Sequence, residues 1–269
     1  MSKKYLILGS EGFIGKNVCD YFSNRGCEIK HYDIKNSLEE DARVKELNFE
    51  KYDVVIFLAW NVGGAKYLYR KDTQYDQLHD NLGLLNNVFS QYEKIDKSKT
   101  KMIYISTQLA EDCDTIYGVT KRFGEAWANL NSCLSLRFWN AYGSYETITE
   151  KSHVISDFIH QAMDSGVIKM RTNGQEKRQF VHMKDICRAI EHGIDNDIKG
   201  VYDVTTYQWV SIMEIANIIA DQFGAKILVG NEIGGTQDVP IKGRMIGWSP
   251  SVNLEYGLKE TIEKHRELK

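Results

Sequence analysis

The sequence predicts an α/β protein, a doubly wound parallel sheet with a smaller C-terminal α/β lobe. Short apolar runs alternate with helical patterns through the first half of the chain, and a glycine-rich turn follows the first run directly. The length of 269 residues suits one such unit with a modest appendage. These observations together favour a single α/β architecture over a string of separate domains.

Five runs rich in Ile, Val, Leu, Phe or Tyr show little polar alternation, which predicts strands covered on both faces. These runs are Tyr5–Leu8, Glu28–Asp33, Val54–Leu58, Met102–Ser106 and Leu134–Phe138. Helical patterns lie between them at Ile14–Asn24, Gln74–Tyr92 and Val119–Asn129. After Asn140 we expect helices at Ser156–Ser165, Lys184–Gly193, Ile212–Phe223 and Leu254–Glu267, with a short strand at Ile168–Arg171.

Composition excludes several classes of protein. The net charge is −3 and no run of basic residues occurs, so no nucleic-acid surface is expected. The five cysteines form no CxxC pair, which argues against a disulfide framework or a zinc knuckle. No signal-type or membrane-spanning apolar stretch is present. We therefore expect a cytoplasmic protein with reduced thiols and no membrane partner.

A glycine motif opens the first helix. Gly9-Ser10-Glu11-Gly12-Phe13-Ile14-Gly15 follows the first strand, where glycines allow close backbone approach and the helix N-terminus attracts a pyrophosphate. Asp33 lies eighteen residues further on, where a carboxylate would bind an adenosine ribose. The pattern predicts a Rossmann-type NAD site. NADP remains open because Lys35 and Arg43 lie close in sequence, and the simpler alternative is a glycine-rich turn with a solvated aspartate.

A Tyr-x-x-x-Lys pattern occurs twice, and its position separates the two matches. Tyr117 and Lys121 follow a strand that ends in Ser106-Thr107, where ligands bind in an open parallel sheet. Tyr67 and Lys71 follow no such hydroxyl, so we interpret them as a chance match. A lysine one helical turn from a tyrosine can hold the tyrosine pKa down and contact a ribose, which suits proton exchange.

Several further stretches accompany these motifs. They are Asp53–Ala59, Asn81-Leu82-Gly83, Leu136–Gly143 and Arg178–Asp185. Together with the glycine turn and the Thr-Tyr-Lys set, they resemble the extended short-chain dehydrogenase/reductases, in particular the NAD-dependent nucleotide-sugar epimerase/dehydratase family. The resemblance covers nearly the whole chain. It implies a dinucleotide-binding domain at residues 1–139 plus about 174–206, and a substrate-binding lobe at about 140–173 and 207–269.

The resemblance also implies roles for individual residues. Tyr117 would be the general acid/base, Lys121 its partner, and Thr107 the group that binds the reacting sugar oxygen. Asn140 and Arg178 would face the nucleotide diphosphate; the alternatives are a turn cap for Asn140 and a surface ion pair for Arg178. The residues expected to bind the cofactor are Gly9, Gly12, Phe13, Ile14, Gly15, Asp33, Leu58, Ala59 and Lys121. Asn81 and His182 are expected to be structural, and no metal site is expected.

Departures from the family pattern reduce the number of reactions that this chain is expected to catalyse. Dehydratases of this family carry an Asp-Glu pair after the catalytic Thr, whereas Gln108-Leu109 stands here. Tyr117 follows Thr107 at a spacing of only ten residues, so we expect a more open pocket or one closed by Asn61–Gly64. Trp60 stands where many relatives have Ala, either as part of the sugar pocket or as core packing.

Taken together, these features favour a 4-keto-sugar reductase or dehydrogenase acting on a nucleotide-diphosphate sugar. The alternatives are a nucleotide-sugar epimerase and a non-catalytic dinucleotide sensor or structural protein. The family also implies a homodimer formed through the helix at Gln74–Tyr92 and the helix that starts at Tyr117.

Overall fold

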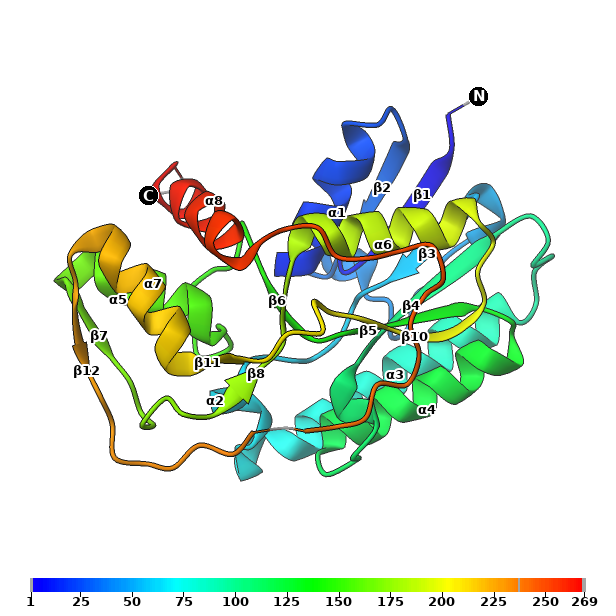
Figure 1. The fold of residues 1–269 in the computed structure, drawn as a ribbon. Helices are drawn as coiled ribbons and strands as arrows, with labels where there is room; N and C mark the ends of the chain where they lie inside the picture. The colour runs from blue at the N-terminus through cyan, green and yellow to red at the C-terminus, as the bar shows by residue number, and fades with distance from the viewer. Residues whose placement is uncertain (1, 237, 268–269) are drawn as a thin grey trace.

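The computed structural model describes residues 2–236 and 238–267, and its centre is a six-stranded sheet (Figure 1). The strand order is β10-β5-β4-β3-β1-β2, and every neighbouring pair is parallel. The strands are β1 (Lys4–Leu8), β2 (Glu28–Tyr32), β3 (Val54–Phe57), β4 (Lys101–Thr107), β5 (Leu134–Phe138) and β10 (Gly200–Val204). The predicted doubly wound parallel sheet is confirmed.

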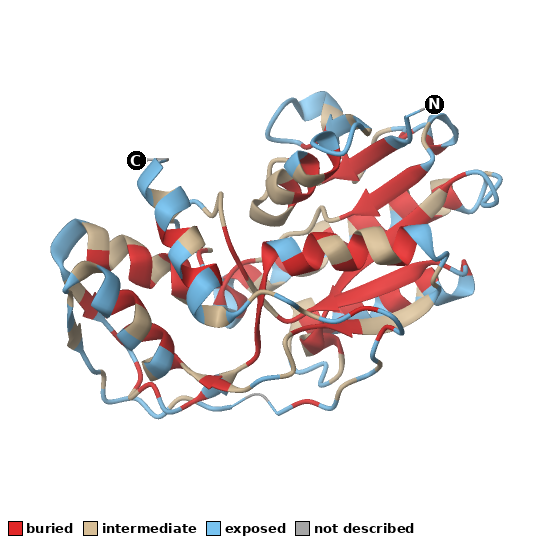
Figure 2. Cartoon of the chain, turned by 45° about the horizontal axis from the view of Figure 1, so that its top comes forward, coloured by how far each residue is buried: buried red, intermediate tan, exposed pale blue. Residues whose placement is uncertain are grey.

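Helices cover both faces of this sheet. α1 (Phe13–Ser23) and α6 (Met183–Asp195) lie on one face, and α3 (Gln74–Tyr92) and α4 (Ile116–Leu130) lie on the other (Figure 1). Successive strand residues point to opposite faces, so Ile7 packs in the core beneath α1 and α6 while Leu6 packs beneath α3 and α4. The strands at the centre of the sheet are accordingly buried almost throughout (Figure 2).

The prediction that all five strands are covered on both faces is wrong for β2. Glu28, Lys30 and His31 are exposed, because β2 is the edge strand of the sheet. Charged side chains on an edge strand oppose pairing with another chain. The opposite edge, β10, was not predicted, since its five residues begin with Gly200 and include Asp203, which interrupt an apolar run.

The remaining elements form a third core beside the sheet. It contains α5 (Val154–Ser165), α7 (Ile212–Phe223) and α8 (Leu254–Glu267), close to the helices expected from the sequence. Three small sheets join this region: β7 (Val167–Lys169) with β12 (Lys226–Leu228), β8 (Lys177–Arg178) with β11 (Val210–Ser211), and β6 (Asn140–Tyr142) with β9 (Phe180–His182). The exact division of the chain into two lobes remains a prediction.

Two buried carboxylates fix the segment that returns from this region to the sheet. Asp203 accepts hydrogen bonds from the backbone N–H groups of Lys242 and Gly243, at 2.6 and 3.1 Å. Asp185, which no solvent reaches, accepts from the N–H groups of Ser251 and Val252 at 3.0 and 2.9 Å. Asp185, part of the Arg178–Asp185 stretch, is therefore structural. Within the described residues, no helix is long and apolar enough to cross a membrane.

Candidate active site

A cavity of about 1220 Å³ opens at the carboxyl edge of the sheet and extends into the second lobe. Ligands of open parallel sheets bind at this edge. Every residue assigned to the site from the sequence lines this cavity: Gly9, Gly12, Phe13, Ile14, Gly15, Asp33, Leu58, Ala59, Thr107, Tyr117, Lys121, Asn140 and Arg178. The structure thus brings together residues that span most of the chain.

The glycine turn forms the cradle that a dinucleotide requires. Gly9 has φ +91°, and a Cβ there would lie 2.6 Å from the backbone nitrogen of Ala59. A Cβ on Gly15 would lie 2.1 Å from the carbonyl oxygen of Gly9, so only glycine allows α1 to start this close to the turn. Among the residues that the structure describes, no side chain caps the N-terminus of α1. These features fit NAD, whose pyrophosphate would bind at the helix N-terminus.

Asp33 lies directly after β2 and closes the far end of the cradle. Its carboxylate accepts hydrogen bonds from the N–H groups of Glu11 and Lys35, at 3.0 and 2.9 Å. The two cations that left NADP open both line the cavity, and each already has a partner there. Arg43 pairs with Asp41 at 2.8 Å and also with Asp80, and Lys35 Nζ donates to the carbonyl of Glu11 at 3.3 Å. This arrangement favours NAD over its 2′-phosphorylated form.

Tyr117 lies at the start of α4, facing the end of β4. The Thr115 hydroxyl caps this helix by accepting from the Gly118 N–H at 3.0 Å, which fixes where the helix begins. Burial raises the pKa of Tyr117 to about 12, and a hydrogen bond with the Thr107 hydroxyl partly offsets this rise. The phenol of Tyr117 is therefore protonated at neutral pH and can serve as a proton donor.

Lys121 lies one helical turn further along α4 and is 3% exposed. Its Nζ donates to the carbonyl oxygen of Ile105 at 2.5 Å. Burial holds the pKa of Lys121 well below its ordinary value, while the nearby carboxylate of Glu125 opposes this shift. The ammonium also lies 3.7 Å from the centroid of the Trp60 ring, a contact that stabilises a cation.

Trp60 packs against the core and also lines the cavity, while a part in the sugar pocket stays a prediction. Its ring packs against Phe57 and Tyr104, with centroids 5.9 and 6.0 Å away, and it also lines the cavity. The contact with Lys121 was not expected from the sequence. It depends on how the loop after β3 packs against α4, and no local motif encodes that packing.

Gln108 occupies the position at which the dehydratases of this family carry an acid. The Thr107 hydroxyl donates to Gln108 Oε1 at 3.0 Å, and the side chain is 6% exposed. The residue beside the reacting group is therefore a neutral amide. Its carbonyl oxygen orients the Thr107 hydroxyl, and it holds no proton that it could release.

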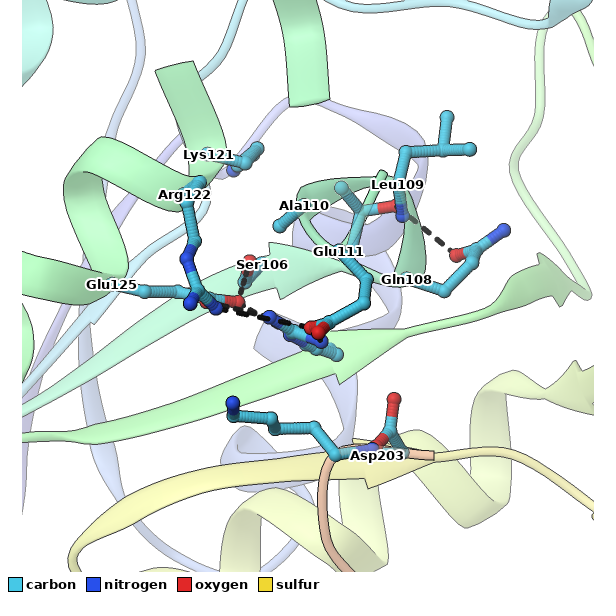
Figure 3. A network of polar contacts seen from close by, with 12 residues as sticks. Ser106, Gln108, Leu109, Ala110, Glu111, Lys121, Arg122, Glu125 and Asp203 are labelled. Carbon is cyan, nitrogen blue, oxygen red and sulfur yellow. Dashed lines mark hydrogen bonds and ion pairs between the residues drawn. The ribbon is translucent and has the colours of Figure 1, made fainter. Parts of the chain in front are cut away.

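A buried ionic network lies beneath the loop that joins Thr107 to Tyr117 (Figure 3). Arg137, which is fully buried on β5, donates to both carboxylate oxygens of Glu125 at 2.7 and 2.8 Å and to Glu111 at 2.6 Å. Ser106 donates to Glu125 at 2.6 Å. The carboxylate of Glu111 thus pairs with Arg137, and Glu111 does not line the cavity.

Asn140 on β6 and Arg178 on β8 both contribute to the cavity wall. Asn140 Nδ2 donates to the carbonyl of Gln179 at 2.9 Å, which ties β6 to β9. Arg178 is half-buried and donates to the carbonyl of Lys177 at 2.8 Å, and its burial lowers the pKa of the guanidinium. Facing a diphosphate remains a prediction for both residues.

The loop after β3 packs against the second lobe. The Gly64 N–H donates to the Lys151 carbonyl at 2.8 Å, and Lys151 Nζ donates to Asn61 Oδ1 at 3.0 Å. Asn61 is held in turn by Asn81, whose Oδ1 accepts from the Asn61 N–H at 2.8 Å. Tyr67 also donates to Asn61 Oδ1, at 2.7 Å. These contacts give Asn81 and Tyr67 structural roles, and they place the Asn61–Gly64 loop at the rim of the cavity.

His182 is buried at the start of α6. Its Nδ1 accepts from the Lys184 N–H at 3.3 Å, and its ring packs on Tyr142 with centroids 5.1 Å apart. Across the part of the chain that the structure describes, no group of three or more His, Cys, Asp or Glu side chains could hold a metal ion.

Comparison with known proteins identifies the family to which this fold and site belong. A Rossmann-type sheet with a glycine cradle and a Thr-Tyr-Lys set defines a dinucleotide-dependent enzyme of the short-chain dehydrogenase/reductase type. The chain belongs to the NAD dependent epimerase/dehydratase family, whose model matches residues 5–204. NAD is the cofactor of this family.

Individual relatives differ in the reaction that they catalyse. The chain is 25% identical to UDP-N-acetyl-alpha-D-glucosaminuronate decarboxylase of Bacillus cytotoxicus, over all of this chain and 99% of the relative. It is 22% identical to dTDP-4-dehydro-6-deoxyglucose reductase of Escherichia coli, over 97% of both chains. Among solved structures, a GDP-6-OMe-4-keto-L-xylo-heptose reductase from C. jejuni superposes with a TM-score of 0.82 at 15% identity, over all of this chain and 99% of that one.

Proposed function

We propose that this enzyme reduces a keto group on a nucleotide-diphosphate sugar, most directly a 4-keto sugar, with NADH as the reductant. The observation that supports this proposal is the Thr107-Tyr117-Lys121 set beside the neutral Gln108. A dehydratase needs an acid at that position. Two of the relatives named above are keto-sugar reductases, which agrees with the proposal.

The chemistry of the side chains suits reduction. Bound NADH supplies the hydride. The Thr107 hydroxyl would turn from Gln108 Oε1 to donate to the carbonyl oxygen of the sugar, and Tyr117 would donate its proton to that oxygen as it becomes a hydroxyl. Lys121 then stabilises the phenolate that remains, because its ammonium lies on the same face of α4. Trp60 and the Ile105 carbonyl hold that ammonium in place.

Arg178 and Asn140 would hold the nucleotide. We assign the diphosphate to Arg178, because a guanidinium matches phosphate oxygens in geometry and charge, and Asn140 lies in the same cavity. The NAD preference follows from Asp33, whose carboxylate repels a 2′-phosphate, and from the engagement of Arg43 by two carboxylates.

The test is the absorbance of reduced nicotinamide during incubation of the enzyme with NADH and a panel of nucleotide 4-keto sugars. Stoichiometric loss of the band with one substrate supports a reductase. No net loss together with a new sugar isomer would instead identify an epimerase, in which hydride leaves and returns. Neither change with any substrate in either direction would favour a non-catalytic role.

We also propose that the enzyme is a homodimer. Exposed apolar side chains lie on the two helices that cover one face of the sheet: Leu82 on α3, and Val119 and Phe123 on α4. The Phe123 ring is 52% exposed. Pairing of α3 and α4 across a two-fold axis would bury these side chains in a four-helix bundle.

A further inference from the structure

The buried ammonium of Lys121 has no carboxylate as a direct partner among the residues that the structure describes. Glu125 lies one turn further along α4, but its carboxylate is engaged by Arg137 at 2.7 and 2.8 Å and by Ser106 at 2.6 Å. In Figure 3 the side chain of Lys121 lies apart from this network. Because a buried charge without a partner is costly, the groups that do contact the ammonium decide whether it stays charged.

Two groups contact this ammonium directly. The Ile105 carbonyl accepts a hydrogen bond from it at 2.5 Å, and the centroid of the Trp60 ring lies 3.7 Å from Nζ. The rings of Tyr104 and Tyr117 also face it, but their centroids are 5.2 and 6.0 Å away. Tryptophan attracts a cation more strongly than the other aromatic side chains do, and the attraction grows where water is excluded. The Trp60 ring is therefore the main aromatic partner of Lys121.

The Trp60 ring is fixed by its surroundings. It packs against Phe57 and Tyr104, with centroids 5.9 and 6.0 Å away. The backbone of the next residue is also held, because the Asn61 N–H donates to Asn81 Oδ1 at 2.8 Å. A ring held in this way can direct an ammonium instead of following its movements. A smaller side chain at this position would leave that face of the ammonium to water.

We propose that Trp60 is a positioning residue for catalysis, whose ring keeps the Lys121 ammonium charged and in place to stabilise the phenolate of Tyr117. This inference rests on the proposed function and extends it to a residue outside the Thr-Tyr-Lys set. Trp60 acts through Lys121 and takes no part in proton transfer. Since the contact favours the charged form, it opposes the lowering of the Lys121 pKa by burial, and its removal should lower that pKa further.

The first measurement tests the contact without any substrate. The emission of Trp60 is obtained as the difference in fluorescence between the native enzyme and Trp60→Phe, and it is followed through an alkaline pH titration. Loss of the Lys121 proton removes the cation from the ring, so we expect the difference emission to change in one step. The step should be absent when the same difference is taken in a Lys121→Met background.

The second measurement is the pH profile of reductase activity. In Trp60→Leu, the alkaline loss of activity should move to lower pH by about one unit, the effect of losing a desolvated contact between a cation and a ring. The kcat should fall by about tenfold or more, while KM changes by less than about threefold. Trp60→Phe keeps an aromatic face, so it should show less than about half of the pH shift.

The matched control is Trp127→Leu. Trp127 also lies on α4 and packs against the same core as Trp60, with its ring centroid 5.3 Å from that of Phe89, but it does not line the cavity. Its replacement should lower the thermal stability and leave both kcat and the pH of the alkaline loss close to the native values. Thermal unfolding of every variant separates a loss of folding from a loss of positioning.

Four outcomes would overturn the inference. They are a difference emission with no step that depends on Lys121, an alkaline loss at the native pH in Trp60→Leu, an equal shift in Trp60→Leu and Trp60→Phe, and an equal shift in Trp127→Leu. A failure of the proposed function looks different, because the native enzyme would then reduce no 4-keto sugar while the Lys121-dependent step in fluorescence remained.

Discussion

Replacing Glu125 by glutamine removes the carboxylate that makes two hydrogen bonds with the buried guanidinium of Arg137. Arg137 is not exposed at all and Glu125 is 3% exposed, so solvent cannot replace the lost charge. Breaking such a pair from one side costs about 3–5 kcal/mol. Because Glu111 still contacts Arg137 at 2.6 Å, we expect the lower end of this range, about 3 kcal/mol.

Thermal and urea unfolding measure this loss. For a chain of this size, about 3 kcal/mol corresponds to a Tm lowered by roughly 6–12 °C. The matched control is Arg122→Gln, since Arg122 contacts the same Glu125 carboxylate at 3.3 Å but its side chain is 46% exposed. Exposed pairs contribute less than about 1 kcal/mol, so the control is expected to unfold close to the native temperature.

Glu125→Gln also changes the electrostatic environment of the active-site residue Lys121. The carboxylate of Glu125 raises the pKa of Lys121, opposing the effect of burial. Glu125→Gln should therefore move the alkaline loss of reductase activity to a lower pH. A Glu125→Gln variant within about 1 kcal/mol of the native stability, or no more affected than Arg122→Gln, would refute this account of the network.

Three further predictions concern the cofactor, the proton and the assembly. As the pH rises, reductase activity should be lost before pH 10.5, the ordinary pKa of lysine, because burial lowers the pKa of Lys121 and loss of its proton removes the cation beside Tyr117. The Lys121→Arg variant keeps its charge, so this alkaline loss of activity should disappear even if the rate is low. An alkaline loss at the same pH in Lys121→Arg would contradict the assignment. Asp33→Asn should reduce the preference for NAD over NADP by about tenfold in binding titrations, whereas an unchanged ratio would show that Asp33 does not select the cofactor. Phe123→Glu on the exposed face of α4 should yield monomers by light scattering while the native enzyme is dimeric; a monomeric native enzyme would exclude the proposed interface.

The sequence alone predicted the buried strands and the glycine turn, because each depends on the residues within its own segment. Buried strands such as β3 are continuous apolar runs, and the glycine turn before α1 combines residues that only this backbone geometry requires. The exposed edge strand β2 and the strand β10 at the opposite edge were harder to predict from the sequence. Their character depends on which strands lie beside them, and a linear sequence does not display that order.

Some features of the candidate site could likewise be predicted from the sequence, and others could not. Thr107, Tyr117 and Lys121 could be selected because their spacing and position at a strand end carry chemical meaning. The contact between Trp60 and Lys121 joins residues sixty-one positions apart, so no local spacing could have indicated it. Glu125 lies one turn beyond Lys121 on α4, so spacing alone could have indicated it, although its partner Arg137 lies on β5.

The most direct test of the central claim follows the hydride itself. The enzyme is incubated with NADH carrying deuterium at nicotinamide C4 on the transferred face and with the nucleotide 4-keto sugar that it accepts, and the sugar product is examined by mass spectrometry. The account predicts one deuterium in each product sugar, matched by an equal amount of NAD, with the reaction lost in Tyr117→Phe. A product sugar without deuterium, or undiminished transfer in Tyr117→Phe, would contradict it.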